Sequence, residues 1–309
     1  MKLASYTYKD KLGDARIGAV INNSIIDLQE AYRHFSHSKH GTEQAHHLLP
    51  SRPSAFFKEG LPAIQRGKEA IEYVKIHPVA NAEFALDEVK LEQPVPNPSK
   101  IICIGTNYAD HVKEMKSELP EYPVLFAKFA NALIGPEDSI EKSPFTEKLD
   151  YEVELAVVIG RKAARVKKQD VHHYIAGYTI GNDISARDLQ KRTPQWLQGK
   201  TLDNSTPIGP WVVTTDEVTA PGHLSIKSYV NGEARQSSNT SQLIFDIPTI
   251  IEFISSLVTL EPGDIILTGT PHGVGFAMDP PQFLQAGDRV TMEIEKIGTM
   301  ENIVKAITE

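Results

Sequence analysis

"LDYEVELAVVIG", residues 149–160, carries two carboxylates inside an otherwise apolar run. Alternate side chains of a β-strand lie on the same face, so Glu152 and Glu154 are expected to point together. Two like charges at this separation raise each other's pKa or require a cation. A strand with one solvated face is the ordinary explanation of such a pair, because charged residues are usually exposed. Here the run continues as "LAVVIG", apolar on both faces as in a covered strand, which favours a buried pair with a cationic partner.

A third acid, Asp183, follows the apolar stretch 175–181 in "YTIGNDISARDLQ". By itself it is explained as a turn residue. Together with Glu152 and Glu154 it supplies three oxygen donors from two strands. Hard oxygen ligands suit Mg²⁺ or Mn²⁺, with water in the remaining positions. The sequence therefore predicts a divalent-metal site at these three carboxylates.

The composition is that of an ordinary globular protein of 309 residues, with 40% apolar and 23% charged residues and a formal net charge of −8. No apolar run approaches the roughly 20 residues of a membrane span, and the N-terminus has no apolar signal-peptide core. The single cysteine, Cys103, lies in an apolar stretch, which fits the core of a cytoplasmic protein. Nucleic acid and anionic membranes are poor partners for this charge, whereas a small anionic molecule is acceptable if a metal or local cations receive it.

Proline marks the expected domain boundary. Residues 92–100, "EQPVPNPSK", contain three prolines in five positions, and proline removes backbone donors and fixes φ. We place the boundary in this linker, between a small N-terminal α+β domain, residues 1–95, and a larger domain, residues 96–309. In the smaller domain, the patterns predict a hairpin over residues 17–28 and a helix over residues 61–77.

The larger domain is rich in strands, with short helices. Buried strands are expected in "IICIG" and "PVLFAKF", and further strands in "LDYEVELAVVIG", "YIAGYTIGND", "PIGPWVV", "LSIKSYVNGEARQ", "GDIILTGT" and "RVTMEIEKIG". Asn231–Gly232 is a strong hairpin signal, and residues 246–260 have the pattern of an amphipathic helix. This mixture predicts an α+β fold with rolled or sandwiched sheets and not alternating βαβ units.

Five segments resemble the fumarylacetoacetate hydrolase family, with its bacterial acylpyruvate hydrolase and oxaloacetate decarboxylase members. They are "IICIGTNYADHVKEM", "LDYEVELAVVIG", "GYTIGNDISARDLQ", "GKTLDNSTPIGP" and "LEPGDIILTGTPHGVG", in this order from about residue 100 to the C-terminus. The resemblance implies a mixed β-sandwich roll and a homodimer. It also implies a divalent metal, Mg²⁺ or Mn²⁺, at the positions of Glu152, Glu154 and Asp183.

"TNYADHVKEM", residues 106–115, places His111 and Glu114 three apart, so that they are neighbours on a helix. A histidine held by a carboxylate can act as a general base near neutral pH, although an exposed His–Glu pair on a surface is the simpler explanation. The resemblance implies that this pair lies on a lid that orders over the substrate and activates water. Tyr108, Val112 and Met115 form a separate apolar stripe expected to pack inward.

Lys200 in "LQGKTLDN" is not part of a P-loop, because Pro194 stands where that motif needs its first glycine. The resemblance implies that Lys200 faces the substrate and stabilises developing enolate charge. It also implies that Gln190 hydrogen-bonds the substrate and that Thr270 contacts the substrate carboxylate. Lys128 is expected to be structural or to support the site from behind.

These residues predict metal-dependent C–C bond cleavage of a small 2-oxo or 2,4-dioxo acid through a metal-stabilised enolate, as in acylpyruvate or fumarylpyruvate hydrolases. Decarboxylation of oxaloacetate, or an isomerisation, uses the same enolate and is nearly as well supported. A different class, a non-catalytic metal-binding protein that acts through protein contacts, is disfavoured. A structural metal would need none of His111, Glu114 and Lys200.

Overall fold

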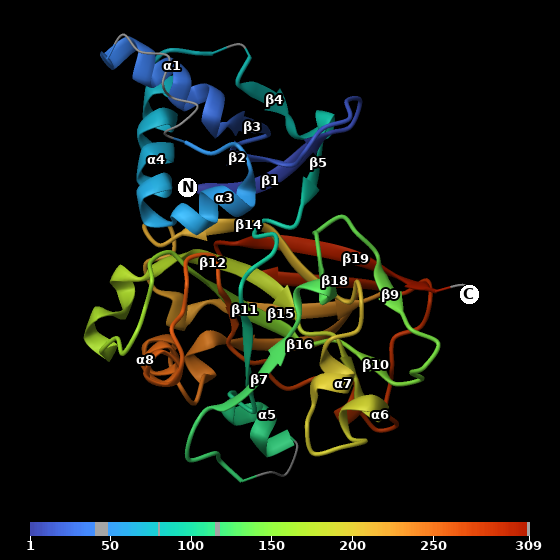
Figure 1. Ribbon diagram of the computed structural model, residues 1–309. Coiled ribbons are helices and arrows are strands. Elements are labelled where there is room, and N and C mark those ends of the chain that lie inside the picture. The colour runs from blue at the N-terminus through green and yellow to red at the C-terminus, as the bar shows by residue number, and fades with distance from the viewer. Residues whose placement is uncertain (41–48, 80, 115–117, 308–309) are drawn as a thin grey trace.

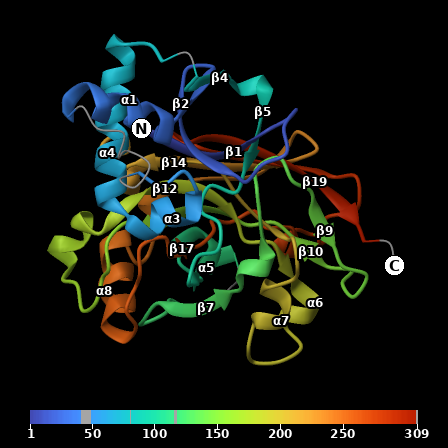
Figure 2. The same cartoon turned by 45° about the horizontal axis from the view of Figure 1, so that its top comes forward.

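The computed structural model describes residues 1–40, 49–79, 81–114 and 118–307. Figure 1 shows the N-terminal elements, drawn in blue, against one side of a strand-rich body, and Figure 2 shows the same arrangement from a second direction. In the described residues, helices are few and mostly short. The fold is therefore of the α+β class with sandwiched sheets, as the sequence predicts.

A mixed sheet of 12 strands forms the centre of the molecule. Its main path runs in space through β4 (Glu83–Ala85), β3 (Ser24–Asp27), β2 (Arg16–Ile21), β1 (Lys2–Tyr8), β14 (Thr206–Thr214), β12 (Ile175–Asn182), β11 (Val153–Ile159), β17 (Ile265–Leu267), β6 (Ile101–Gly105) and β7 (Val124–Lys128). Off this path, β5 (Val89–Glu92) pairs with β1 and β8 (Leu133–Ile134) with β14. β17 is parallel to β6, and β8 is parallel to β14.

β1 joins the N-terminal part of the chain to the rest of this sheet. Lys2 pairs with Val213, and Leu3 with Val212, in antiparallel register with β14. The proline-rich linker begins at the end of β5, which itself pairs with β1. Strand pairing thus crosses the boundary expected at residues 95 and 96, and the division into two domains stays a prediction.

In its described residues, the N-terminal part contains the helices α1 (Leu28–His40), α3 (Pro53–Glu59) and α4 (Leu61–Ile76). The helix predicted over residues 61–77 is α4, and its apolar positions, among them Ile64, Ile71 and Val74, are buried. The predicted hairpin is also confirmed. β2 and β3 are joined through Asn22, whose positive φ of 53° an asparagine tolerates better than most residues.

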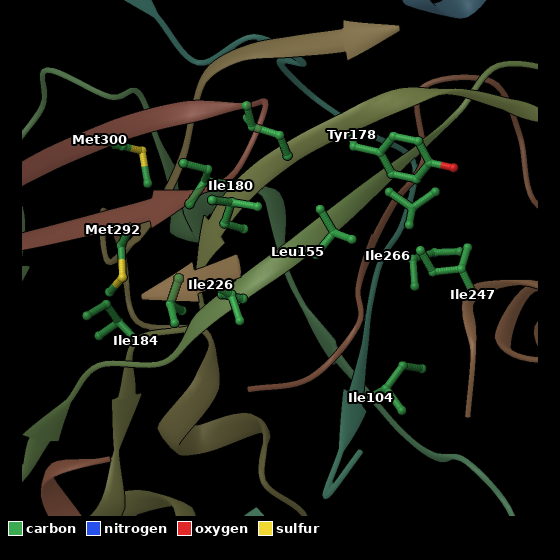
Figure 3. Close-up of a cluster of buried hydrophobic side chains, with 14 of the residues drawn as sticks. Ile104, Leu155, Tyr178, Ile180, Ile184, Ile226, Ile247, Ile266, Met292 and Met300 are labelled. Atoms are coloured by element: carbon green, nitrogen blue, oxygen red, sulfur yellow. The ribbon is translucent and has the colours of Figure 1, made fainter. Parts of the chain in front are cut away.

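A second sheet of five strands has the order β16 (Glu233–Asn239), β15 (Ser225–Val230), β18 (Arg289–Ile294), β19 (Gly298–Ala306) and β9 (Ile140–Lys142). The predicted turn at Asn231–Gly232 joins β15 and β16, with φ of 53° and 80°. Side chains of the two sheets meet in one core, shown in Figure 3, where Leu155 lies between Ile226 of the second sheet and Tyr178 of the first.

α8 (Ile247–Leu257) is the amphipathic helix predicted over residues 246–260, and the carboxylate of Asp246 caps it by accepting the N–H of Thr249 at 2.9 Å. The remaining elements are short: α5 (Ala109–Glu114), α6 (Arg187–Gln190), α7 (Leu197–Lys200), β10 (Leu149–Asp150), β13 (Ser185–Ala186), η1 (Leu86–Glu88), η2 (Ala130–Ala132), η3 (Lys168–His173), η4 (Pro221–His223), η5 (Thr240–Gln242) and η6 (Gly275–Ala277). Within the described ranges, none of the helices combines the length and apolar character needed to cross a membrane.

The prediction that residues 123–129 form a buried strand is only partly right. The strand exists as β7, but in the described residues it pairs with β6 alone and lies at the edge of the sheet. Its Val124 is 36% exposed, and Lys128 at its other end is buried. An apolar composition fits an edge strand and a central strand equally well, so the pattern does not separate them.

The central strand β11 is covered on both faces, which explains its apolar run. Val153 and Leu155 belong to the core between the two sheets. Ala156 and Val158 belong to the second core, which includes the N-terminal helices. Glu154 precedes Ala156 by two residues and so shares its face. One face of this strand therefore changes from apolar to acidic along its length.

Candidate active site

The acidic trio, Glu152, Glu154 and Asp183, is brought together by strand register. Val153 of β11 pairs with Asn182 of β12, which places Asp183 beside Glu152, and the N–H of Asp183 donates to the carbonyl oxygen of Glu152 at 2.9 Å. One carboxylate oxygen of each acid lies within 4.8 Å of the others, and all three residues are buried. The proximity expected from strand alternation is therefore present.

Three cations neutralise part of this trio. The Nζ of Lys200 donates to Glu152 Oε2 and Asp183 Oδ2, each at 2.8 Å. The Nζ of Lys128 donates to the other oxygen of Asp183 at 2.6 Å. Arg187 Nη2 lies 2.6 Å from Glu152 Oε1 as an ion pair, without the alignment of a hydrogen bond. Lys200 thus contacts two of the acids, and Lys128 supports Asp183. The expectation that Lys200 faces the substrate stays a prediction.

The charges divide unequally between the two glutamates. Burial alone would raise the pKa of Glu152, but Lys200 and Arg187 outweigh it and lower that pKa to about 2. Burial and the charges of Asp183 and Glu152 raise the pKa of Glu154, whose carboxylate accepts the N–H of Gly269 at 2.6 Å.

These donors fit a divalent cation of the Mg²⁺ or Mn²⁺ kind. All of them are carboxylate oxygens, which such hard cations prefer, and they converge from two adjacent strands. The raised pKa of Glu154 also shows that the nearby lysines do not fully compensate the negative charge of the acidic trio. A bound cation would favour the ionised form of Glu154. The residues are therefore compatible with the metal site that the sequence predicts.

A cavity of about 350 Å³ opens over Glu152 and Glu154 of the acidic trio. Gln190 and Thr270, expected to bind substrate, line it together with Lys200. The aromatic rings of Phe126 and Trp196 form another part of the wall and meet edge to face at 5.3 Å between centroids. The cavity thus combines a charged floor with an apolar side, as small-molecule sites do.

His111 and Glu114 lie on α5, one turn apart. His111 Nδ1 is 3.0 Å from Glu114 Oε2, and the His111 side chain lines the cavity while remaining largely buried. The other oxygen of Glu114 accepts the N–H of Gly273 at 2.9 Å. The expected apolar stripe of this helix is buried at Tyr108 and Val112, and Met115 lies outside the described residues.

Asp110, one residue before His111, fixes the beginning of α5. Its Oδ2 accepts a hydrogen bond from Ser238 Oγ at 2.8 Å and contacts His272 Nδ1 at 2.8 Å. Burial would raise the pKa of Asp110, but the hydrogen bonds from His272 and Ser238 outweigh it and lower that pKa. We call Asp110, Ser238 and His272 the α5 clasp. The ring of His272 in this clasp is exposed.

Sequence reasoning missed Asp150 and Arg187. Asp150 is fully buried, receives Arg187 Nε at 2.8 Å, and accepts the N–H groups of Gly275 and Phe276 at 2.8 and 3.0 Å. A signal existed for both residues. The spacing of Glu152 and Glu154 continues backwards to Asp150, and Arg187 precedes the predicted Gln190 by one helical turn.

Gln236 was also missed, and no local pattern marks it. Its amide nitrogen donates to Thr270 Oγ1 at 2.8 Å, and its amide oxygen accepts the N–H of Val153 at 3.0 Å. This fully buried side chain of the second sheet therefore positions Thr270 against β11. By contrast, Cys103 lies in the core as expected, and burial raises the pKa of its thiol.

Comparisons with known proteins agree with this geometry. The family model "Fumarylacetoacetate (FAA) hydrolase C-terminal" matches residues 100–305. The fumarylacetoacetate hydrolase domain-containing protein 2 homolog of Dictyostelium discoideum is 42% identical, over 97% of this chain and 96% of its own. The oxaloacetate tautomerase YisK of Bacillus subtilis is 42% identical, over 93% of this chain and 95% of its own. The maleylpyruvate hydrolase of Sphingobium sp. SYK-6, solved in complex with manganese(II) and pyruvate, has a TM-score of 0.75 and 28% identity over the full length of both chains.

The mixed-sheet fold and the buried acidic pocket are those of a class of enzymes, which the family model matches over residues 100–305. The chain belongs to the fumarylacetoacetate hydrolase family. The resemblance seen in the five sequence segments is thereby confirmed.

Proposed function

We propose that the protein catalyses the keto–enol tautomerisation of a small 2-oxo diacid, with oxaloacetate as the expected substrate. The observation that carries the proposal is the position of His111, buried at the cavity wall and held by Glu114 over the acidic trio. The relative from Bacillus subtilis, named an oxaloacetate tautomerase, supports the choice of reaction. This is the isomerase variant of the alternative that the sequence leaves open.

Glu152, Glu154 and Asp183 would hold the Mg²⁺ or Mn²⁺, which, when bound, withdraws electrons from the 2-oxo group of the substrate and acidifies the neighbouring C3–H. The other residues would handle protons and orient the substrate. Gln190 and Thr270 line the cavity. The amide N–H groups of Gln190 can donate to the carboxylate or oxo oxygens of the substrate. The hydroxyl of Thr270 donates to the carbonyl oxygen of Val153 at 3.0 Å, so Thr270 would contact the substrate without donating that proton.

His111 would move the proton. From the enol, the O–H bond at C2 breaks, the C2–C3 double bond becomes the C2 carbonyl, and one C–H bond forms at C3. No other bond changes and no water is consumed. With Nδ1 held by Glu114, the ring keeps one nitrogen for the substrate, through which it can accept and return a proton.

Lys200 would stabilise the negative charge that develops on the substrate oxygen during this transfer. Two of the three N–H groups of its ammonium are used by Glu152 and Asp183. No group in the described residues accepts a hydrogen bond from the third, which could bind a substrate oxygen. Because the ammonium is buried and fixed by these acids, it needs little reorganisation in the transition state.

C–C bond hydrolysis, the reaction that the sequence favours, is the second candidate. The His111–Glu114 pair is equally suited to remove a proton from water. The solved maleylpyruvate hydrolase, with its manganese ion and pyruvate, has the same fold over its full length. Decarboxylation of oxaloacetate would use the same floor of the site and differs only in the bond that breaks.

A substrate panel separates these reactions. The purified protein, treated with a chelator and reloaded with Mg²⁺ or Mn²⁺, is given oxaloacetate, acetylpyruvate or fumarylpyruvate. Tautomerisation speeds the exchange between enol and keto oxaloacetate, followed by absorbance and NMR, without any change of mass. Pyruvate and CO₂ from oxaloacetate would indicate decarboxylation, and acetate plus pyruvate from acetylpyruvate would indicate hydrolysis. If the metal-loaded protein does not accelerate the keto–enol exchange of oxaloacetate, the proposal is overturned.

His111→Ala and Glu154→Gln test the roles of the residues. We expect His111→Ala to lower turnover about 100-fold or more while Mn²⁺ binding, measured by calorimetry, is kept. Glu154→Gln should weaken Mn²⁺ binding itself. His223→Ala, a substitution remote from the cavity, is the matched control and should change neither. Loss of Mn²⁺ binding in His111→Ala would contradict the assignment.

Three further expectations from the sequence remain proposals. They are the homodimer implied by the family resemblance, the cytoplasmic location suggested by composition, and the division into residues 1–95 and 96–309. Light scattering of the purified chain tests the first of them.

A further inference from the structure

We infer that Lys191 binds the distal carboxylate of a dicarboxylic substrate, so that this cavity selects 2-oxo diacids over 2-oxo monoacids. The inference rests on the proposed function, because it names the substrate class of the same site. It assigns a role to a side chain that neither the sequence motifs nor the mechanism above uses.

Lys191 is placed at the cavity by the end of α6. Its backbone N–H donates to the carbonyl oxygen of Arg187 at 3.2 Å, directly after Gln190. Its ammonium lies 3.6 Å from the centroid of the Phe276 ring, and both side chains line the cavity. Lys191 is exposed, whereas Glu152 and Glu154 are buried, which puts this cation at the rim of the cavity and the two glutamates at its floor.

The ring beneath Lys191 is fixed by the site itself. The backbone N–H of Phe276 donates to Asp150 Oδ2 at 3.0 Å, and Asp150 is paired with Arg187. Arg187 in turn contacts Glu152 of the acidic trio. The aromatic ring that Lys191 contacts is therefore connected to the floor of the cavity through Asp150 and Arg187. A ligand that reaches from the floor to Lys191 would bind groups whose positions are already fixed.

Lys191 also differs from the other cavity cations in having no acidic partner. Arg187 and Lys200 each contact carboxylates at 2.6 to 2.8 Å. In the part of the chain that the structure describes, Lys191 has no such ion pair and contacts only an aromatic face. Burial and the positive charges of Arg187 and Lys148 lower the pKa of Lys191. An anion in the cavity would relieve this repulsion.

The charge of Lys191 allows the cavity to accept a second substrate carboxylate. The acidic trio with Asp150 makes four carboxylates, and Lys128, Lys200 and Arg187 are the three cations in contact with them. A divalent metal would turn this deficit of one positive charge into an excess of one. The carboxylate beside the 2-oxo group of the substrate would cancel that excess. A distal carboxylate then requires another cation, and Lys191 is the one at hand.

The test compares oxaloacetate with its 4-methyl ester, which removes only the distal charge. In the wild-type protein loaded with Mn²⁺ we expect kcat/KM to favour the diacid. Lys191→Met keeps the length of the side chain without its charge and should reduce this preference about 10- to 100-fold, the usual range for one charge-assisted hydrogen bond. Lys191→Arg should restore much of it.

Lys148→Met is the matched control. Lys148 adds to the positive field at Lys191 but does not line the cavity. If Lys191 binds the carboxylate directly, Lys148→Met leaves the kcat/KM preference for the diacid within about twofold of wild type. Added salt then does not abolish the difference between Lys148→Met and Lys191→Met. Equal effects of the two substitutions, or an unchanged preference in Lys191→Met, would overturn the inference and leave Lys191 as a surface lysine on an aromatic ring.

A binding measurement separates this inference from the proposed reaction. Calorimetry of the Mn²⁺-loaded protein with 3,3-difluoro-oxaloacetate, which has no C3 proton, and with its 4-methyl ester reports recognition without turnover. A diacid preference that depends on Lys191 supports the inference even if no tautomerisation is found. Turnover of oxaloacetate together with equal binding of both analogues would support the reaction and reject the role of Lys191.

Discussion

Arg187 is the side chain through which the buried acids depend on one another. It lies between Asp150 and Glu152, at 2.8 and 2.6 Å, and is itself buried. Burying charges is costly, so such a group is favourable only while all its partners are present. Removing the arginine takes the ion pair from buried Asp150 and leaves Lys200 as the ion-pair partner of Glu152 in the described residues.

We therefore expect Arg187→Met to lower the free energy of unfolding by about 3–5 kcal/mol. Chemical denaturation followed by tryptophan fluorescence and circular dichroism measures this change. Adding Asp150→Asn to the variant should recover part of the loss, because one unpaired charge is removed. A change below about 1 kcal/mol in Arg187→Met would show that the ion pairs contribute little.

Strand alternation made the acidic trio predictable, because Glu152, Glu154 and Asp183 stand next to recognisable strands. Asp150 and Arg187 are 37 residues apart, and their pairing depends on a fold that no local pattern reveals. Gln236 comes from the other sheet altogether. The residues that hold the site in place are therefore harder to predict than those that line the cavity.

At the scale of elements, α5 is a short helix that depends on contacts outside itself. The α5 clasp holds its first turn, and Glu114 binds Gly273 at its end. Six residues form no stable helix alone in water, so the position of His111 depends on these contacts. Both His272 and Gly273 belong to the segment that also carries Thr270, so the proposed base and a cavity wall are connected.

We expect His272→Asn to lower kcat roughly tenfold, because a loosened α5 places His111 less accurately. Mn²⁺ affinity should stay unchanged, since the acidic trio lies on other elements. His77→Asn, which alters an exposed histidine at the end of α4 in the N-terminal part, is the control. Equal losses of Mn²⁺ affinity and of kcat would mean that the clasp supports the whole pocket and not the helix alone.

Elements with strong local patterns, α4, α8 and the two hairpins, were predictable because their periodicity and turn residues are explicit. β7 was assigned as a strand, but its place at the sheet edge depends on which strands pair, a long-range property. The pairing of β1 with β14 across the linker is invisible for the same reason.

At the scale of the whole molecule, polar contacts reinforce the junction between the N-terminal helices and the central sheet. Asp216, just after β14, accepts hydrogen bonds from Lys68 of α4 at 2.8 Å and from Thr214 at 2.6 Å. Burial alone would raise the pKa of Asp216. The hydrogen bonds from Lys68 and Thr214 outweigh this effect, Lys68 most strongly, and lower that pKa to about 2.

This lowered pKa predicts how stability at the junction depends on pH. A carboxyl group with a lower pKa in the folded state stabilises the protein above its unfolded pKa of about 3.9, and the gain disappears as pH falls through the folded pKa. Asp216→Asn should therefore lower Tm at pH 6, and the difference from wild type should shrink between about pH 4 and pH 2. Because the side chain is 54% exposed, screening keeps the effect below about 1 kcal/mol. A difference that is independent of pH would contradict this assignment.

Truncation tests the wider junction. Without residues 1–95, the edge of β14 that pairs with β1 is open, and the apolar face carrying Ala156 and Val158 loses the helices of its core. We expect the fragment of residues 96–309 to aggregate, because unpaired edges and exposed apolar faces associate. Size-exclusion chromatography of the fragment measures this. A soluble, folded fragment would favour two independent domains.

The two faces of β11 also limit how this chain can change. Replacing one of its side chains alters one contact, and neighbouring residues can adjust to the difference in volume. Inserting or deleting a single residue within the strand would rotate everything on one side of the change by half a turn, exchanging the faces that Glu154, Leu155 and Ala156 occupy. Core and acids would be displaced together. The length of this strand is therefore expected to be far less free to vary during divergence than the identity of its residues.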